Sequence, residues 1–226
     1  ALDIVEGSNT VVRPVPAAAS DELTLGSFNA FRLCDEFANT TSRCSANDAM
    51  ELDADRVAHE IGQISAYLRE VLGSPDVIGL QEVENLDVLQ RLAAKIAEDG
   101  GPTYSAHLVE GNDVGGIDVG YLVNPARITD VVVEQRLGAE TWDDPDSSDG
   151  PRLLHDRPPL LLQASFIGNG RPFAFQLINN HTRSRGGVDV SNADGERTRA
   201  KRFLQAASIA ALVQALQTDA ATADIP

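Results

Sequence analysis

The apolar residues of this chain change their spacing near residue 103, and this change limits the possible folds more than any other feature. Upstream, apolar side chains recur every three or four residues in two groups: Val57, Ile61, Ile64, Leu68 and Val71, then Leu86, Leu89, Leu92 and Ile96. Such spacing predicts two amphipathic helices. Downstream, short apolar runs predict strands over 104–109, 117–123, 128–133, 160–166 and 173–178. The pattern indicates an α/β or α+β fold with helices packed on mixed sheets.

Three further segments complete the predicted order. The runs at 23–28 and 76–80 read as buried strands, and a last helix is predicted from about Glu196 to Gln217. We expect that helix to turn four residues inward: Leu204, Ala207, Ala211 and Leu212. The turn residues of NPAR (124–127) and GNGR (168–171) predict antiparallel hairpins.

Composition and charge narrow the class of protein. The 226 residues are 42% hydrophobic, which suits one globular domain, and no apolar run reaches the roughly 20 residues that span a bilayer. The net charge of -16 excludes a protein that binds polyanions over its whole surface. The stretch from Arg183 to Arg202 nevertheless holds six cations and three anions, so any nucleic-acid contact is expected to be local.

Polar residues stand at the ends of several predicted strands. They lie in SFN (27–29), LQEVEN (80–85), GGIDVGYL (115–122) and INNHTRSRGG (178–187). A sheet can aim such side chains into one cleft. Taken singly they have simpler interpretations, since Glu82 could cap a helix and Asn29 could hydrogen-bond its own turn.

Together these segments resemble the endonuclease/exonuclease/phosphatase superfamily of metal-dependent phosphoesterases. Their motif sequences are most similar to those of secreted bacterial nucleases. The resemblance rests on SFNAFRL (27–33), DVIGLQEVEN (76–85), GGIDVGYLVNPARI (115–128) and NNHTRSRGG (179–187). It covers residues 22–226 and leaves 1–21 as an N-terminal extension or linker. It implies a four-layer αββα sandwich, two mixed sheets face to face with flanking helices.

The resemblance also implies roles for single residues. Glu82 would bind a divalent ion, Mg²⁺ or else Mn²⁺ or Ca²⁺, and Asn29 would orient that carboxylate at the metal site. His181 would hydrogen-bond a phosphate oxygen, and Arg157 would suit two such oxygens, although a surface arginine is an equal alternative. Asp118 matches a recurrent position and is expected to brace the site. Substrate contacts are expected from Arg183 and Arg185.

Two motifs of the family do not occur in the chain. They are a Gly-Asp-Phe-Asn-like strand end and a terminal Ser-Asp-His, which supply the groups that orient and deprotonate water. We therefore expect a domain that is incomplete at its C-terminal side and a fragment with little activity of its own. An exposed sheet edge, and self-association through it, are expected for the same reason.

The function expected from these features is hydrolysis of DNA or RNA phosphodiester bonds by a metal-dependent nuclease. The alternatives are a phosphatase or phospholipase acting on a lipid or sugar phosphate, and a non-catalytic binding module of the same fold. Cys34 and Cys44, in a polar loop, are expected to form a disulfide, which favours a secreted, cell-surface or periplasmic protein over one with two free thiols. The acidic run 143–150 fails the EF-hand spacing and is interpreted as a hairpin loop.

Overall fold

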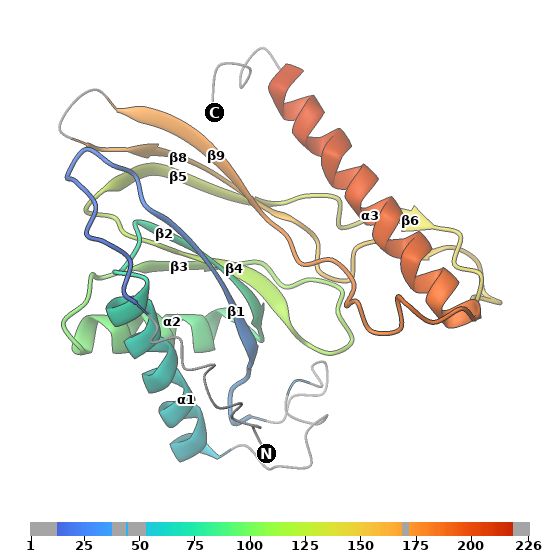
Figure 1. Cartoon of the computed structure of the whole chain (residues 1–226), viewed down its shortest axis with the longest axis horizontal. Helices are drawn as coiled ribbons and strands as arrows, with labels where there is room; N and C mark the ends of the chain where they lie inside the picture. Colours follow the sequence, from blue (N-terminus) through green and yellow to red (C-terminus); the bar gives the residue numbers. More distant parts are fainter. Residues whose placement is uncertain (1–12, 38–43, 45–52, 169–171, 219–226) are drawn as a thin grey trace.

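Two β-sheets lie face to face, and helices α1 and α2 cover the outer face of one of them (Figure 1). The computed structural model describes residues 13–37, 44, 53–168 and 172–218. The larger sheet has the order β1-β2-β4-β3, the smaller one has the order β5-β8-β9, and β6 and β7 form a separate hairpin. The predicted α+β sandwich is confirmed.

The larger sheet is mixed. Strands β1 (Leu25–Leu33) and β2 (Val77–Val83) run parallel, whereas β4 (Asp118–Val123) runs antiparallel to β2 and to β3 (Ser105–Leu108). Every residue of β4 is buried, because helices cover one face of the sheet and the second sheet covers the other. These pairings place the ends of β1 and β2 beside the start of β4.

Both predicted helices of the first half are present. Helix α1 (Ala54–Ala66) starts after Asp53, whose side chain accepts a hydrogen bond from the Arg56 amide, and continues into a π-helical turn, η1 (Tyr67–Val71). Helix α2 (Leu86–Glu98) starts after Asn85, which caps it through the Val88 amide. Their apolar faces form the core between the helices and the larger sheet.

The smaller sheet is antiparallel throughout its described strands, β5 (Ile128–Gln135), β8 (Leu160–Phe166) and β9 (Phe173–Asn179). The hairpin predicted between β8 and β9 is confirmed, although 169–171 lie outside the described residues. The hairpin predicted at 124–127 is wrong, because β4 and β5 belong to different sheets. That turn instead carries the chain across the sandwich.

Helix α3 (Ala193–Thr218) lies beside the hairpin of β6 (Thr141–Trp142) and β7 (Arg152–Leu153) (Figure 1). Its predicted inward face is wrong except for one residue. Leu204 is 38% exposed, Ala207 and Ala211 are exposed, and only Leu212 is buried. The buried face is mostly polar, with Gly195, Thr198, Lys201 and Gln205.

Polar contacts explain that orientation of α3. The Gln205 amide donates to the Leu154 carbonyl oxygen at 2.9 Å, and Lys201 Nζ contacts both carboxylate oxygens of Asp156 at 2.8 Å. The helix is thus held against residues 140–157 by hydrogen bonds and charge, which a search for apolar periodicity does not detect.

A disulfide joins Cys34 to Cys44, as predicted. Both cysteines are buried and pack with Ile117, just before β4. Nearby, the Glu84 carboxylate accepts a hydrogen bond from the Asp35 amide at 2.8 Å. The segment that follows β1 is therefore fixed to the end of β2.

The described part of the N-terminal extension starts at Arg13 and contacts the domain, since the Val15 amide donates to the Val71 carbonyl oxygen at 2.8 Å. Among the residues that the structure describes, none forms a helix long and apolar enough to cross a membrane.

Candidate functional site

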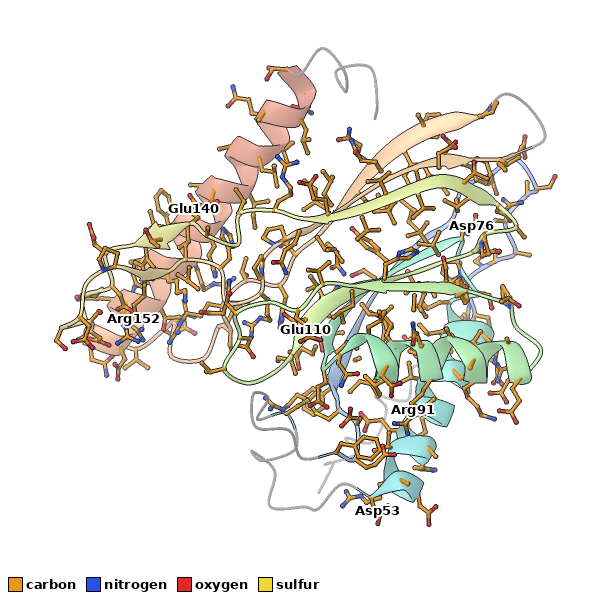
Figure 2. All side chains as sticks on the ribbon, turned by 180° about the vertical axis from the view of Figure 1, so that it is seen from behind. Asp53, Asp76, Arg91, Glu110, Glu140 and Arg152 are labelled. Atoms are coloured by element: carbon orange, nitrogen blue, oxygen red, sulfur yellow. A yellow bond between two sulfur atoms is a disulfide. The ribbon has the colours of Figure 1, made fainter. Side chains whose placement is uncertain are left out.

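Five strand ends meet at one end of the sandwich, opposite Asp76 and on the side of Glu110 (Figure 2). Strands β1, β2 and β9 end there, and β4 and β8 begin there. The polar residues predicted to share a site all stand at these ends: Asn29, Glu82, Asp118, Arg157 and His181.

Glu82 is the centre of this group. Its Oε1 accepts a hydrogen bond from Asn29 Nδ2 at 3.0 Å and lies 3.5 Å from His181 Nε2. Its other oxygen, Oε2, has no hydrogen-bond partner among the described residues. The Glu82 side chain is 18% exposed, so this oxygen belongs to a largely buried carboxylate. Both partners of Glu82 can be neutral, and neither supplies a permanent positive charge.

Backbone irregularities place Glu82 and Asn29. The β1–β2 register shifts between Asn29 and Leu33, and the β2–β4 register shifts beside Glu82, which has a φ of +62°. Phe31 and Arg32 also have positive φ, and the Phe31 amide donates to Asn29 Oδ1 at 2.8 Å. Such conformations cost about 1–3 kcal/mol each and gather at functional sites, where a bulge redirects a side chain.

Asn179 fixes the position of the β9 end. Its Nδ2 crosses between the sheets and donates to the carbonyl oxygens of Leu80 (2.8 Å) and Gly120 (2.9 Å). Its Oδ1 accepts from Gln81 Nε2 at 2.7 Å. Gly79 makes room for it, because a Cβ there would lie 3.3 Å from the Asn179 amide. Nothing in the sequence separates this asparagine from its neighbours, yet its contacts fix the end of β9, two residues before His181.

The surroundings of His181 favour its neutral imidazole form. Burial lowers its pKa, the Arg157 charge lowers it further, and the Glu82 carboxylate opposes both effects. Its Nδ1 is buried without a hydrogen-bond partner in the described part of the chain. Buried polar atoms without partners are rare in folded proteins, so this histidine is unlike one that serves only the core.

Arg157 orders the backbone beside His181. Its guanidinium donates to the carbonyl oxygens of His181 (3.4 Å) and Thr182 (3.5 Å) and to Asp113 Oδ1 (3.1 Å). The Arg157 side chain is 11% exposed, so the alternative of a freely solvated arginine does not fit. Asp113 was not predicted from sequence, because it stands in a loop and its partner is 44 residues away.

Asp118 supports the loop that holds Asp113 through its contact with Gly111. Burial raises its pKa to about 7, the Gly111 amide hydrogen bond opposes the rise, and the nearby Glu110 and Asp113 charges add to it. A Cβ at Gly111 would collide with the Asp118 carboxylate, so this close approach requires glycine. These contacts suit the bracing position expected for Asp118.

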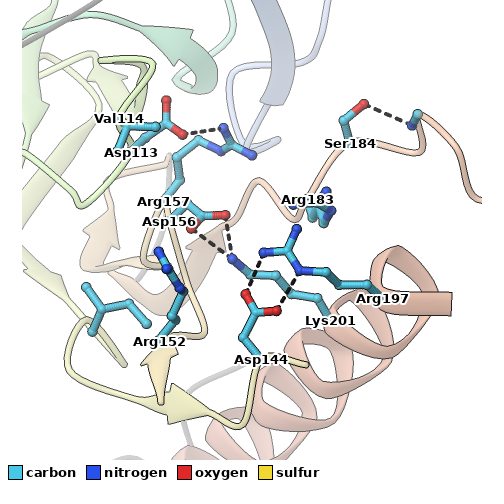
Figure 3. A pocket seen from close by; sticks show the side chains of 12 residues that line it. Asp113, Val114, Asp144, Arg152, Asp156, Arg157, Arg183, Ser184, Arg197 and Lys201 are labelled. Atoms are coloured by element: carbon cyan, nitrogen blue, oxygen red, sulfur yellow. Dashed lines mark hydrogen bonds and ion pairs between the residues drawn. The ribbon is translucent and has the colours of Figure 1, made fainter. Parts of the chain in front are cut away.

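A cavity of about 560 Å³ opens beside Arg157, between the β6–β7 hairpin and the start of α3 (Figure 3). Arg183 lines it, but Arg185 is exposed and does not. Arg199 lies outside it and donates to the carbonyl oxygens of Val188 and Val190. The basic stretch noted in the sequence is thus divided between a cavity wall and the outer surface.

The residues present fit a hard divalent cation. Such an ion prefers carboxylate oxygen and keeps several waters, so one glutamate with an open oxygen can hold it together with a phosphate. Asn29 fixes the other oxygen of Glu82 and so orients the open one.

No protein-family model and no curated protein matches the sequence. Similar solved structures include the mannosyl-6-phosphatase of Bacteroides thetaiotaomicron VPI-5482 (16% identity, TM-score 0.43, 88% of this chain and 61% of that one). They also include an endonuclease/exonuclease/phosphatase of Bacteroides vulgatus (15%, 0.42, 71% and 52%) and D. rerio TDP2 complexed with a single-strand DNA product (21%, 0.37, 80% and 52%). The chain thus spans between half and two thirds of these proteins. Some of these similar structures carry the name endonuclease/exonuclease/phosphatase, which is the superfamily that the sequence motifs resemble.

Proposed function

We propose that the protein is a divalent-metal-dependent phosphoesterase, and that its substrate is a nucleic-acid phosphodiester. The observation that carries the proposal is the Glu82 carboxylate, which has one oxygen held by Asn29 and His181 and the other open. A carboxylate buried in this way gains most from an added cation, since neither neighbour neutralises it permanently.

Glu82 would hold Mg²⁺ or Mn²⁺, with Asn29 keeping the carboxylate in place. When bound, the ion would neutralise charge that develops on the phosphate oxygens. His181 is neutral and stands next to Glu82, so it can donate a hydrogen bond to a non-bridging phosphate oxygen without a fixed charge. Arg157 acts mainly by holding the His181 and Thr182 carbonyl oxygens, which sets the direction of the histidine.

The site as described holds groups for binding metal and phosphate, but no second histidine close to Glu82. General-base help supplies typically about 10² to 10⁴-fold in rate. We therefore propose that residues 1–226 alone hydrolyse phosphodiesters slowly.

The test is hydrolysis of plasmid DNA and of bis(p-nitrophenyl) phosphate with Mg²⁺ by residues 1–226, beside any longer form that the reading frame encodes. His181→Ala should lower the rate about 100-fold or more, as loss of a transition-state donor does. His59→Ala is the matched control, because this histidine is exposed on α1. Equal rates for the two variants would overturn the assignment of His181, and full activity of residues 1–226 would show that the water-activating group lies within them. A phosphomonoester hydrolysed faster than either diester would point to a phosphatase.

Export to an oxidising compartment is also proposed, and the Cys34–Cys44 disulfide supports it. Fractionation of producing cells should find the protein outside the cytoplasm, with no thiol that reacts before reduction. A protein confined to the cytoplasm with two titratable thiols would contradict this proposal.

A further inference from the structure

The cavity beside Arg157 has an excess of positive charge in an otherwise acidic protein. Its charged lining consists of five cations and three carboxylates: Arg152, Arg157, Arg183, Arg197 and Lys201, with Asp113, Asp144 and Asp156. The whole chain has a net charge of -16. A concave site of the opposite sign to the rest of the surface marks a place where an anion is attracted locally.

Each carboxylate of the lining is already paired with one cation. Arg197 donates to both carboxylate oxygens of Asp144, from Nε at 2.6 Å and from a terminal nitrogen at 2.5 Å. Lys201 binds Asp156 at 2.8 Å, and Arg157 binds Asp113 at 3.1 Å. These three pairs leave Arg152 and Arg183, which form no ion pair with a carboxylate among the described residues (Figure 3).

The two remaining arginines have donors to spare. The side-chain contact of Arg183 is with Thr198 Oγ1 at 3.3 Å, through Nε, so the terminal nitrogens of its guanidinium are not engaged in the described structure. Arg152 comes from the exposed strand β7 on another wall of the cavity. A guanidinium fork matches two oxygens of a phosphoryl group, and two forks can hold one such group.

Two buried ion pairs support part of the cavity lining. Lys201 is 4% exposed, and the Asp144 side chain that binds Arg197 is 1% exposed. These buried pairs tie the start of α3 to the β6–β7 hairpin and to residue 156. A site built on such supports loses little entropy when it binds.

The cavity adjoins the Glu82 site through Arg157. This arginine lines the cavity and also contacts the His181 and Thr182 carbonyl oxygens, and Arg183 follows directly in the chain. A ligand at Glu82 and His181 would therefore lie close to Arg157, which is part of the cavity lining.

We propose that the cavity is a second anion subsite, which takes a further phosphoryl group of the same substrate molecule whose reacting phosphate lies at Glu82 and His181. The inference rests on the proposed function. The cavity's volume of about 560 Å³ is within the range of small-molecule sites and admits a phosphate with its attached sugar. The second group could be the next phosphodiester of a strand or the terminal phosphate of a small bisphosphate, and both are phosphoryl anions.

Binding in EDTA tests the subsite without any need for hydrolysis. The double variant Arg152→Gln with Arg183→Gln removes both cavity arginines that lack a carboxylate partner in the described structure. The control variant Arg199→Gln removes an arginine that lies outside the cavity. The ligands are a trinucleotide, with internal diesters, and a nucleoside 3′,5′-bisphosphate, with terminal phosphates. We expect the double variant to bind at least one of them about 10-fold more weakly, at roughly 0.7 kcal/mol per arginine, and with a smaller dependence on salt.

The ligand that loses affinity identifies the source of the second phosphoryl group, and loss with both means that the subsite takes either. Unchanged affinity for both ligands, or equal loss in Arg199→Gln, would overturn the proposal. Thermal melting of the variants checks that they fold.

A second measurement separates this inference from the proposed function. In the active form, the double variant should raise KM for a dinucleotide with a 5′-phosphate and leave KM for bis(p-nitrophenyl) phosphate, which has one phosphorus, within twofold. Equal increases for both substrates would show that the arginines do not contact a second phosphate. Arginine-dependent binding in EDTA without hydrolysis by any form would remove the proposed function and keep the anion site.

Discussion

Strand β2 has a carboxylate at each end, and the two ends are neutralised in different ways. Before the strand, Asp76 binds Arg127 Nε at 2.6 Å and accepts hydrogen bonds from the Thr24 amide and hydroxyl, both at 2.9 Å. At the other end, Glu82 contacts the Asn29 amide and the His181 ring through one oxygen, and its second oxygen has no partner in the described part of the chain.

The difference separates a structural joint from a site. Arg127 also lies over the Phe166 ring at 4.9 Å and donates to the carbonyl oxygens of Ser20 and Glu22, so it ties the N-terminal segment and both sheets together. A cation built into the chain makes that end permanent. Among the residues that the structure describes, the Glu82 end has no such cation, and we propose this end as the place of an exchangeable ion.

The largest expected effect is on the joint. Arg127→Met leaves Asp76 buried without its cation and should lower the free energy of unfolding by about 3 kcal/mol, as is usual when one partner of a buried pair is removed. Glu82→Gln should change it by less than about 0.5 kcal/mol. Urea unfolding followed by circular dichroism measures both. Equal losses would mean that Glu82 is as structural as Asp76 and would break the comparison.

A third charged contact, Arg197 with Asp144, lies near the cavity and resembles the Asp76 joint. The Arg197 hydrogen bonds lower the pKa of Asp144 to about 2, so the folded state favours its ionised form. Asp144→Asn should therefore lower stability by about 2 kcal/mol at pH 7. The difference between wild type and variant should shrink as the pH falls from 4 through 2, because the carboxyl is protonated in both states only below its folded-state pKa of about 2. If the stability difference between the wild type and Asp144→Asn does not change with pH, the Arg197–Asp144 pair is not the source of that difference.

Asp118 should show the opposite dependence on pH. Burial raises its pKa to about 7, so between pH 4 and 7 the folded state holds a proton that the unfolded state has released. Its contribution to stability is complete below pH 4 and is lost as the pH rises through 7. Asp118→Asn, which stays neutral, should flatten the wild-type decline by about 1 kcal/mol or more. Unfolding curves at pH 5 and pH 8 test this, and parallel slopes in the two proteins would contradict it.

The strand-end residues of the site could be predicted because their motifs stand in order along the chain. Asn29 and Glu82 lie in β1 and β2, which pair in the larger sheet, and His181 follows β9 of the facing sheet. What could not be predicted depends on contacts between distant segments. Asp113 binds Arg157, which is 44 residues away, and the positive φ of Glu82 stands where the register between β2 and β4 shifts.

Apolar spacing predicted α1 and α2 correctly and misplaced the buried face of α3 for a physical reason. The first two helices pack on a sheet through apolar side chains, whereas α3 packs through Lys201, Gln205 and other polar groups that meet carboxylates and carbonyl oxygens. The hairpin prediction at 124–127 fails for a similar reason. The residues of this segment suit any tight turn, and the Asn124 backbone amide donates to the Asp76 carbonyl oxygen.

The most direct test of the account is calorimetric titration with Mn²⁺ of the wild-type protein, Glu82→Gln and Asp76→Asn, each first shown to be folded by circular dichroism. The account predicts that Glu82→Gln weakens Mn²⁺ binding at least about 10-fold, or 1.4 kcal/mol, while Asp76→Asn binds as the wild type does. Wild-type affinity in Glu82→Gln, or an equal loss in Asp76→Asn, would contradict the claim that the open end of β2 is the metal site.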